Sequence, residues 1–355
     1  MEKPFGLISD THNHAWSAFA ETLPTGVNSR LQQILDETVR AAVEVKRAGG
    51  DTLYHGGDLF HVRGSIAPSV LNPTRDCYKH IVQKLGVRVV INAGNHDLEG
   101  KEAARISSAI TALEDVGCVV VNQPEYGRFD HMVVIPWIAS IEKLKEAIEH
   151  VDPVDRAGTD LLLHAPVDGV IPGLPDHGLT AEYLASLGYR RVFSGHYHHH
   201  KPMEDGKVFS IGNLTPQTWS DVGTKAGFMV VAGDEVTWFK SHAPGFVEID
   251  GATDPDEVPL IADGNYVRIK TSSTKVADHE ALRQFLTDSG AAGVTIIPVK
   301  DPSSAATARA GGSILKAGAT LEQSIGDFIT AKGFARAPDL SKLCAEILAT
   351  VRSVA

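Results

Sequence analysis

Side chains that commonly bind metal ions recur along this chain, each at or just after the end of a stretch that we expect to form a strand. Together they offer carboxylate, imidazole and amide groups, which are typical ligands of divalent cations. A carboxylate such as Asp58 can bridge two cations while the other groups fill the remaining positions. Two cations in one pocket indicate phosphoester hydrolysis. The seven predicted ligands are Asp10, His12, Asp58, Asn95, His164, His196 and His198.

The motifs that contain these residues differ in how specific they are. An Asp-x-His pair or a Gly-Asp pair alone is a weak signal, because an Asp at a strand end often caps a turn. Gly94-Asn95-His96-Asp97 and Gly195-His196-Tyr197-His198 are more specific. Glycine precedes a ligand in three of the motifs, which allows a tight turn and a close approach of the backbone. The alternative to an active centre is a degenerate site that has lost its activity.

The first two thirds of the chain alternate between expected strands and helices. Apolar residues at helical spacing predict a helix from about residue 31 to Gly49-Gly50, with Asn28 or Ser29 as its N-cap. Loops that leave the carboxyl ends of strands in an open α/β sheet converge on one crevice. The predicted strands are 5–9, 52–55, 87–92, 118–121, 132–135, 161–163, 191–194, 208–211, 228–231 and 236–239.

The 355 residues exceed the usual size of a single core, so we expect more than one domain. Prolines and acidic residues between 243 and 259 predict a linker. We therefore predict a catalytic domain at 1–243 and a small α/β cap domain at 244–300. Residues 301–355 should form a flexible connection and a C-terminal helix pair.

Composition sets limits on location and binding. No apolar run is long enough to cross a bilayer and no signal sequence precedes the first strand, so we expect a cytoplasmic protein without membrane contact. The three cysteines lack metal-type spacing and are expected to be reduced thiols. With 33 basic and 44 acidic residues the net charge is −11, which argues against tight unaided DNA binding. Two bound cations would reverse the local potential where a phosphate must lie.

The ordered motifs resemble the calcineurin-like metallophosphoesterases, which implies an α/β fold with two packed sheets in an αββα sandwich. Further segments resemble the SbcD-like DNA repair exonucleases, in particular the shorter phage-type recombination nuclease subunits. These segments are Gly57-Asp58-Leu59-Phe60-His61, Ile135-Pro136-Trp137, Gly212-Asn213-Leu214-Thr215-Pro216 and Lys225-x-Gly227-Phe228. The likeness covers about residues 5–240, and beyond them only the pattern of elements is similar.

The resemblance also implies a role for each site residue. One metal is assigned to Asp10, His12, Asp58 and His198, and the other to Asp58, Asn95, His164 and His196. Manganese is favoured, with magnesium, iron or zinc as alternatives. A hydroxide held between the ions would attack phosphorus in line, and His96 would protonate the leaving oxygen. Asp97 or a backbone carbonyl would fix the His96 tautomer, and His61 would position the DNA strand.

The leading hypothesis is a manganese-dependent DNA exonuclease or endonuclease, the nuclease subunit of an SbcC/SbcD-like complex in DNA repair or recombination. An SbcC-type coiled-coil ATPase and a second copy of the chain are its expected partners. The terminal helices could hold that ATPase or pack only on each other. A free-standing phosphodiesterase or phosphatase for nucleotides or phosphoproteins is the alternative, and a scaffold without turnover ranks last. We expect His14, His199 and His200 to be surface residues.

Overall fold

We describe a computed structural model of the chain. It places residues 3–101, 105–123, 125–250, 253–272, 275–298, 320–332 and 336–354. The chain forms two compact units, one from residues 1–269 with 276–296 and the other from 270–275 with 297–355. All seven predicted ligands belong to the first unit.

The first sheet combines four parallel strands with an antiparallel hairpin. β1 pairs in parallel with β2, β2 with β3 and β3 with β4, whereas β11 and β12 run antiparallel. Two helices, α1 (Ser29–Arg47) and α2 (Pro68–Gln83), pack against this sheet. In spatial order the strands are β12 (Glu235–Lys240), β11 (Gly227–Ala232), β1 (Phe5–Ile8), β2 (Thr52–His55), β3 (Arg88–Asn92) and β4 (Val119–Val121).

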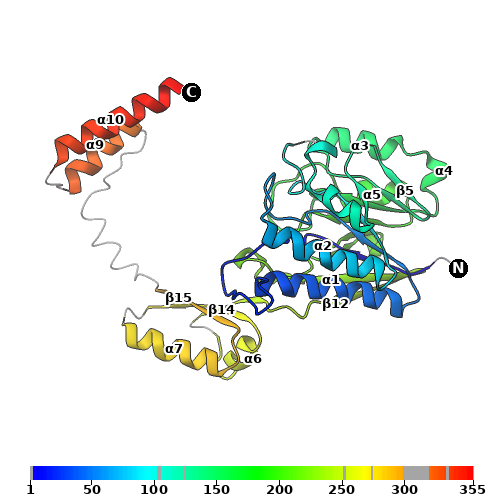
Figure 1. Ribbon diagram of the computed structural model, residues 1–355, viewed down its shortest axis with the longest axis horizontal. Coiled ribbons are helices and arrows are strands. Elements are labelled where there is room, and N and C mark those ends of the chain that lie inside the picture. Colours follow the sequence, from blue (N-terminus) through cyan, green and yellow to red (C-terminus); the bar gives the residue numbers. More distant parts are fainter. Residues whose placement is uncertain are drawn as a thin grey trace. The chain divides into compact units, whose positions relative to one another are not determined.

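The second sheet also has a parallel centre, formed by β6, β7, β8 and β10, with antiparallel strands at both edges. The short helices α3 (Ile141–His150), α4 (Pro153–Arg156) and α5 (Ala181–Ser186) belong to this half of the unit (Figure 1). In spatial order the strands are β5 (Gly127–Phe129), β6 (Met132–Val134), β7 (Asp160–His164), β8 (Val192–Gly195), β10 (Val208–Ser210) and β9 (Lys201–Met203).

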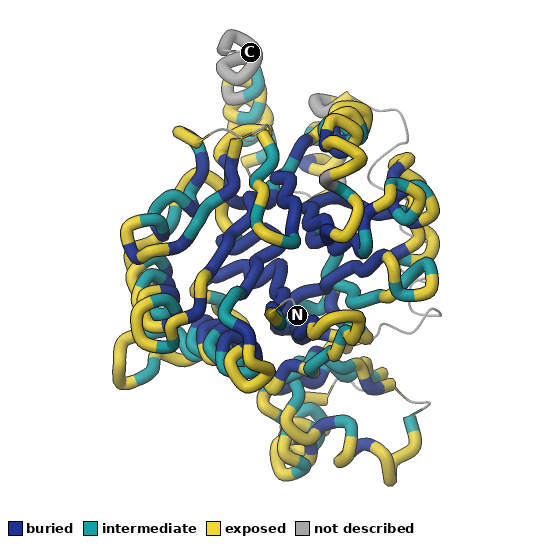
Figure 2. The backbone as a smooth tube through the Cα atoms, turned by 90° about the vertical axis from the view of Figure 1, so that its right-hand side faces the viewer, coloured by how far each residue is buried: buried dark blue, intermediate teal, exposed yellow. Residues whose placement is uncertain are grey.

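Side chains of successive strand residues enter different cores because they point to opposite faces of a sheet. In β7, Leu162 packs in the core that joins both sheets, while Leu161 and Leu163 pack with residues of α3 and α5. In β1, Leu7 lies in the shared core and Ile8 packs with α1. Both sheets are therefore buried on two faces, which agrees with the dark central strands of Figure 2. The predicted α/β fold with two packed sheets is confirmed.

The predicted first helix is α1, and its start follows from its cap. The Asn28 side chain accepts hydrogen bonds at 3.1 Å from the backbone N–H groups of Arg30 and Leu31. These bonds satisfy two of the donors that a helix start leaves free. Leu31, Ile34 and other residues at helical spacing are buried against the sheet.

The described residues also form short 3₁₀ helices in the loops. They are η1 (Arg105–Ser107), η2 (Ala109–Val116), η3 (Glu204–Gly206) and η4 (Trp219–Asp221).

A third sheet follows, with the strand order β13 (Phe246–Ile249), β14 (Tyr266–Thr271) and β15 (Gly293–Pro298). It packs with α6 (Val258–Ala262) and α7 (Val276–Asp288) around a small apolar core. Strand β13 lies within the segment expected as a linker, and α6 begins at its end. Apolar residues inside that segment bury against the sheet despite the prolines around them. The domain boundaries at 243 and 300 stay predictions.

Arg30 joins this third sheet to the long first loop. Its guanidinium lies 5.3 to 5.4 Å from the ring centres of Trp16, Phe246 and Tyr266. The same group donates a 2.6 Å hydrogen bond to the carbonyl of Gln217. Such cation–π contacts are strongest where water is excluded, and Arg30 is only 4% exposed. Through Arg30, Trp16 of the first loop is thus linked to Phe246 and Tyr266 of the third sheet.

The last two helices, α9 (Leu321–Lys332) and α10 (Ala337–Val354), pack against each other. Residues 301–319, predicted to be a flexible connection, lie outside the described residues. In the described part of the chain, none of the helices has the length and apolar character needed to traverse a bilayer.

Candidate metal centre

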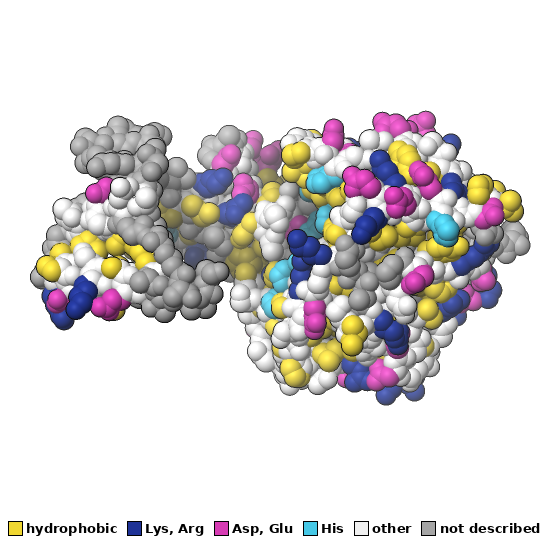
Figure 3. Space-filling model, turned by 90° about the horizontal axis from the view of Figure 1, so that it is seen from above, with side chains coloured by type: hydrophobic (Ala, Val, Ile, Leu, Met, Phe, Trp, Pro, Cys, Tyr) yellow, Lys and Arg dark blue, Asp and Glu magenta, His cyan; other side chains and the backbone are white. Residues whose placement is uncertain are grey.

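The predicted ligands sit together at the carboxyl ends of the parallel strands. Histidine side chains are grouped around a recess on this unit in Figure 3. The strands β1, β2, β3, β7 and β8 carry, in that order, Asp10 with His12, Asp58, Asn95, His164, and His196 with His198. Strands from both sheets therefore contribute to one site.

Among the described residues, three groups of side chains have atoms close enough to share a cation: His12 with His61 and His96, and two groups made only of predicted ligands. Asp10, His12 and His198 form one group, and Asp58, His164 and His196 form the other. Within each group the candidate ligand atoms all lie within 4.8 Å of one another.

Asp58 lies between the two groups, and Asn95 completes the second one. The Asp58 Oδ2 atom is 3.6 Å from His12 Nε2 and 3.4 Å from His164 Nε2. The Asn95 Oδ1 atom is 3.2 Å from His164 Nε2 and 3.0 Å from His196 Nδ1. The structure thus brings all seven predicted ligands together, with Asp58 in the position that a bridging ligand needs.

Hydrogen bonds between the loops hold the ligands in place. The backbone N–H of Asp10 donates to the Gly57 carbonyl and that of His12 to the Asp58 carbonyl, both at 3.0 Å. The His96 N–H donates to Asp58 Oδ1 at 2.8 Å. The His196 N–H donates to the Asp10 carboxylate at 3.1 Å. Each carboxylate is therefore oriented by the loop of another strand.

Several ligand positions have an unusual backbone conformation. Among the described residues other than glycine, only seven have a positive φ, and four of them are predicted ligands. The left-handed conformation costs about 1–3 kcal/mol for such residues and is typical of functional sites. The four angles are 49° for Asp10, 44° for His12, 55° for Asp58 and 96° for His196.

Two glycines are required by the crowding of the site. Gly57 has a φ of 109°, and a Cβ atom there would collide with the His164 imidazole and with Gly94. A Cβ atom at Gly94 would collide with the carboxylate and the backbone N of Asp58. Any larger residue at either position would push a ligand out of place.

The protonation of the site follows from burial and from neighbouring charges. Burial raises the pKa of Asp10 to about 6, and the nearby Asp58 carboxylate adds to this increase. Burial also acts on Asp58, but the neighbouring imidazoles, His164 foremost, bring its pKa below the usual range. Burial lowers the pKa of His12, and it lowers that of His196 to about 3. Both imidazoles are therefore neutral near pH 7, as metal ligation requires.

These side chains fit two divalent cations. The partners of Asp10 and Asp58 in the described part of the chain are hydroxyl, imidazole and backbone N–H groups, with no lysine or arginine among them. The Nδ1 atom of His12 is buried and has no hydrogen-bond partner among the described residues. Against the effect of burial, the Asp58 carboxylate raises the pKa of His164 to about 9, so without metal this imidazole balances a buried charge. A bound metal would take over that charge by displacing the proton.

The sequence profile of the calcineurin-like phosphoesterases matches residues 3–200. This chain belongs to the calcineurin-like phosphoesterase family. The family typically uses a dinuclear metal centre, and the two Asp/His groups could bind metal. The chain is thereby a metal-dependent phosphoesterase by family, while the assignment of individual ligands stays a prediction.

Two solved structures are similar to this calcineurin-like phosphoesterase. A dimetal phosphatase from Danio rerio is 13% identical, with a TM-score of 0.40, and the match covers 67% of this chain and 95% of that one. The Pseudomonas putida nuclease MPE is 15% identical, with a TM-score of 0.27, and the match covers 66% of this chain and 86% of that one. No curated protein matches the chain.

His96 and His61 lie beside the metal ligands in this phosphoesterase. The His96 Nδ1 atom is 2.7 Å from the His61 carbonyl oxygen, so Nδ1 carries a proton and Nε2 is left free. Asp97 has a different role, because its carboxylate accepts hydrogen bonds from the Phe60 and Gly94 N–H groups. The His96 tautomer was expected to be fixed by Asp97 or by a backbone carbonyl. In the structure a backbone carbonyl, that of His61, accepts the hydrogen bond from His96 Nδ1. The rings of His61 and His96 are stacked, with centres 5.7 Å apart.

Sequence reasoning missed a carboxylate that orients one ligand. The Asp221 Oδ1 atom accepts a 2.7 Å hydrogen bond from His198 Nδ1, which leaves Nε2 free to face a cation. Its Oδ2 atom accepts from the N–H groups of Gln217 and Thr218, and Gln217 Nε2 donates to the Asp10 carbonyl. The sequence signal was present, because Thr218 and Asp221 form a capping box.

Trp137 packs against the second group, with its ring 5.3 Å from that of His196. His14 lies at the edge of the site, where its ring is 5.1 Å from that of His61. His200 stacks on Trp238 and its Nδ1 bonds to the Ile211 carbonyl. His14, His199 and His200, which were expected to be surface residues, are all partly buried.

Proposed function

We propose that this phosphoesterase is a manganese-dependent DNA nuclease, the catalytic subunit of an SbcC/SbcD-like complex. The observation that carries the proposal is the position of His61 and His96 beside a site with room for two cations. In this proposal His96 protonates the leaving alkoxide, and His61 positions the DNA strand. Two divalent cations, when bound, would supply Lewis acidity and lower the pKa of water.

The proposed proton donor is His96 in its imidazolium form, which would give the Nε2 proton to the leaving oxygen and keep the Nδ1 proton that bonds to the His61 carbonyl. The His61 carbonyl orients the ring, and the His96 N–H is fixed by Asp58, so the imidazole has little freedom to turn. A sugar alkoxide is a poor leaving group and needs a proton, whereas nitrophenolate leaves without one. The importance of His96 should therefore depend on the leaving group.

The experiment compares wild-type protein and His96→Ala on linear DNA and on bis-p-nitrophenyl phosphate, both with manganese. Turnover of DNA should fall about 10²–10⁴-fold in the variant, and that of the nitrophenyl ester much less. Metal content, measured by elemental analysis, should stay at two ions per chain. Equal losses on both substrates would contradict the role of His96 as proton donor.

The competing function is a free-standing phosphodiesterase or phosphatase that acts on nucleotides or phosphoproteins. The same two groups of ligands would serve it. Wild-type activity on linear DNA, bis-p-nitrophenyl phosphate and p-nitrophenyl phosphate separates the possibilities. Hydrolysis of the monoester alone would overturn the nuclease proposal.

We also propose an SbcC-type coiled-coil ATPase as a partner and a second copy of the chain as another. The net charge of −11 is consistent with a catalytic subunit whose hold on DNA is shared. Co-purification of a large coiled-coil ATPase with the full chain would support the first partner. A monomer mass in light scattering at micromolar concentration would argue against the second.

A further inference from the structure

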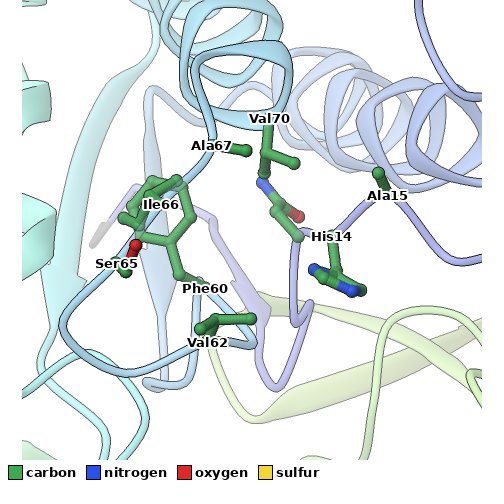
Figure 4. A pocket seen from close by; sticks show the side chains of 9 residues that line it. His14, Ala15, Phe60, Val62, Ser65, Ile66, Ala67 and Val70 are labelled. Carbon is green, nitrogen blue, oxygen red and sulfur yellow. The ribbon is translucent and has the colours of Figure 1, made fainter.

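A small pocket opens next to the candidate metal centre. Its volume is about 200 Å³, and three segments form its wall: the first loop, the turn after β2 and the start of α2. Figure 4 shows His14 and Ala15 on one side and Phe60, Val62 and Ile66 on the other, with Ala67 and Val70 at α2. The complete lining is Asn13, His14, Ala15, Phe60, Val62, Ser65, Ile66, Ala67 and Val70.

The pocket wall is formed by chain segments that adjoin predicted ligands. Asn13 follows His12 in the chain, and Phe60 lies two residues after Asp58. The two segments run side by side, because Asn13 N donates to the Leu59 carbonyl at 2.7 Å. The wall of the pocket and the metal ligands therefore share one rigid piece of backbone.

His61 stands between the ligands and the pocket. Its ring centre is 5.4 Å from that of His12, on the side of the metal groups. It is also 5.1 Å from the ring of His14, which lines the pocket, and 4.6 Å from that of Trp16. A substrate with its phosphate at the metal groups would reach the pocket by passing His61.

The chemistry of the wall selects an uncharged group. None of the nine lining residues is Asp, Glu, Lys or Arg, and Phe60, Val62, Ile66 and Val70 supply carbon surface. A phosphate would find no cation there. Ligand pockets for drug-sized molecules measure about 300–1,000 Å³, so a volume of about 200 Å³ suits a single ring system.

Hydrogen bonds fix the orientation of the Asn13 side chain in the pocket wall. Asn13 is 2% exposed, and its Nδ2 donates to Thr74 Oγ1 at 3.2 Å. Thr74 in turn donates to the Val70 carbonyl, so the orientation of the amide is settled. Asn13 Oδ1 then has no hydrogen-bond partner among the described residues. This oxygen has almost no accessible surface, so Asn13 holds the wall in place and offers no hydrogen bond to a ligand in the pocket.

We propose that the pocket binds the nucleobase of the nucleotide whose phosphodiester is cleaved. A base is flat and uncharged, so it matches the carbon walls, on which it can stack. This inference rests on the proposed phosphodiesterase function, and it identifies the substrate as a nucleotide ester. The carbon walls that would contact the base are formed by Phe60, Val62, Ile66 and Val70.

The test uses two esters that release the same p-nitrophenolate, thymidine 5′-(p-nitrophenyl phosphate) and methyl p-nitrophenyl phosphate. Only the first carries a base. Ala67 is exposed at the start of α2, so Ala67→Trp should fill the pocket without disturbing the core. Ser69→Trp, on an exposed position of the same helix outside the pocket lining, is the matched control.

Wild-type protein should show a kcat/KM about tenfold or more higher for the thymidine ester, the size expected for stacking of one base. Ala67→Trp should remove most of this preference, and Ser69→Trp should keep it. Thymidine should inhibit hydrolysis of the methyl ester by wild type more strongly than by Ala67→Trp. Ser65→Phe, a second exposed pocket position, should repeat the result.

Equal kcat/KM values of wild type for the two esters would overturn the nucleobase inference and leave the phosphodiesterase proposal standing. Parallel losses on both esters in Ala67→Trp and Ser65→Phe would have the same meaning. Absence of turnover on either diester, with hydrolysis of p-nitrophenyl phosphate, would overturn the proposed function and the inference with it.

Discussion

The two ends of strand β7 each lie beside a buried carboxylate, but the partners of the two carboxylates differ. At its first residue, the buried Asp160 carboxylate accepts hydrogen bonds of 2.7 to 3.1 Å from Arg190 and Arg191. At its last residue, His164 faces the buried Asp58, which has no lysine or arginine partner in the described part of the chain. Asp160 and His164 are 0% and 1% exposed, so burial is equal at both ends.

The difference indicates where the chain provides its own cations and where it requires added ones. A buried carboxylate is stable only with a compensating positive charge. The Asp160 end contains two guanidinium groups, whereas the Asp58 end contains imidazoles, which can give up a proton and bind a metal. The first arrangement supports the fold, and the second leaves space for metal. Substitutions at the two ends should therefore change different properties.

The largest effect on activity is expected from Asp58→Asn at the metal end. The carboxylate lies between the two groups of ligands, so its loss should weaken both ions. Phosphodiester hydrolysis should fall by about 10³-fold or more, because both cations take part in catalysis. Elemental analysis after dialysis should give fewer than two ions per chain. Two ions and unchanged turnover would rule out a bridging role.

At the other end, Asp160→Asn should reduce stability rather than metal binding. It leaves Arg191, which is buried, and the partly buried Arg190 without their shared carboxylate. Removing one partner of a buried ion pair costs about 3–5 kcal/mol, which urea unfolding would measure. Asp51→Asn is the control, because the Lys3–Asp51 pair is exposed and should contribute less than about 1 kcal/mol. Equal effects in both variants would refute the contrast.

A smaller effect is expected from Asp221→Asn, which keeps the shape but removes the charge beside His198. The hydrogen bond from His198 Nδ1 orients that imidazole, so its weakening should reduce affinity for one ion only. Substitution of such a partner typically lowers metal affinity about 10–100-fold. Isothermal titration with manganese should show one weakened site and one unchanged site. If both sites kept wild-type affinity, Asp221 would have no part in metal binding.

The smallest effect should come from His200→Ala. This ring stacks on Trp238, and it bonds to the Ile211 carbonyl rather than to a predicted ligand. Turnover and metal content should remain within about twofold of wild type, because neither group of ligands is touched. A loss of one ion in this variant would show that the histidine run after His198 extends the metal site.

Much of the site could be predicted because it follows from short-range pattern. The Gly-Asp, Gly-Asn-His-Asp and Gly-His-x-His segments each follow an apolar strand, and parallel strands bring their carboxyl ends to one edge. The helix start at Asn28 was equally local, since a cap acts on the next few residues. Segment 243–259 was predicted to be a linker, but it contains strand β13. Phe246 and Ile249 are buried there by contacts that the local prolines do not reveal.

The amino-acid sequence by itself determined the family, the two-sheet fold and the set of candidate ligands, because each depends on residue type and on periodicity within one segment. Only the tertiary structure decided that Asp221 orients His198 and that the His61 carbonyl orients His96. It also decided that a pocket with an unpartnered Asn13 oxygen opens beside them. These features join loops that are distant in sequence, and their geometry is set by how the strands and helices that carry the loops pack rather than by any local preference.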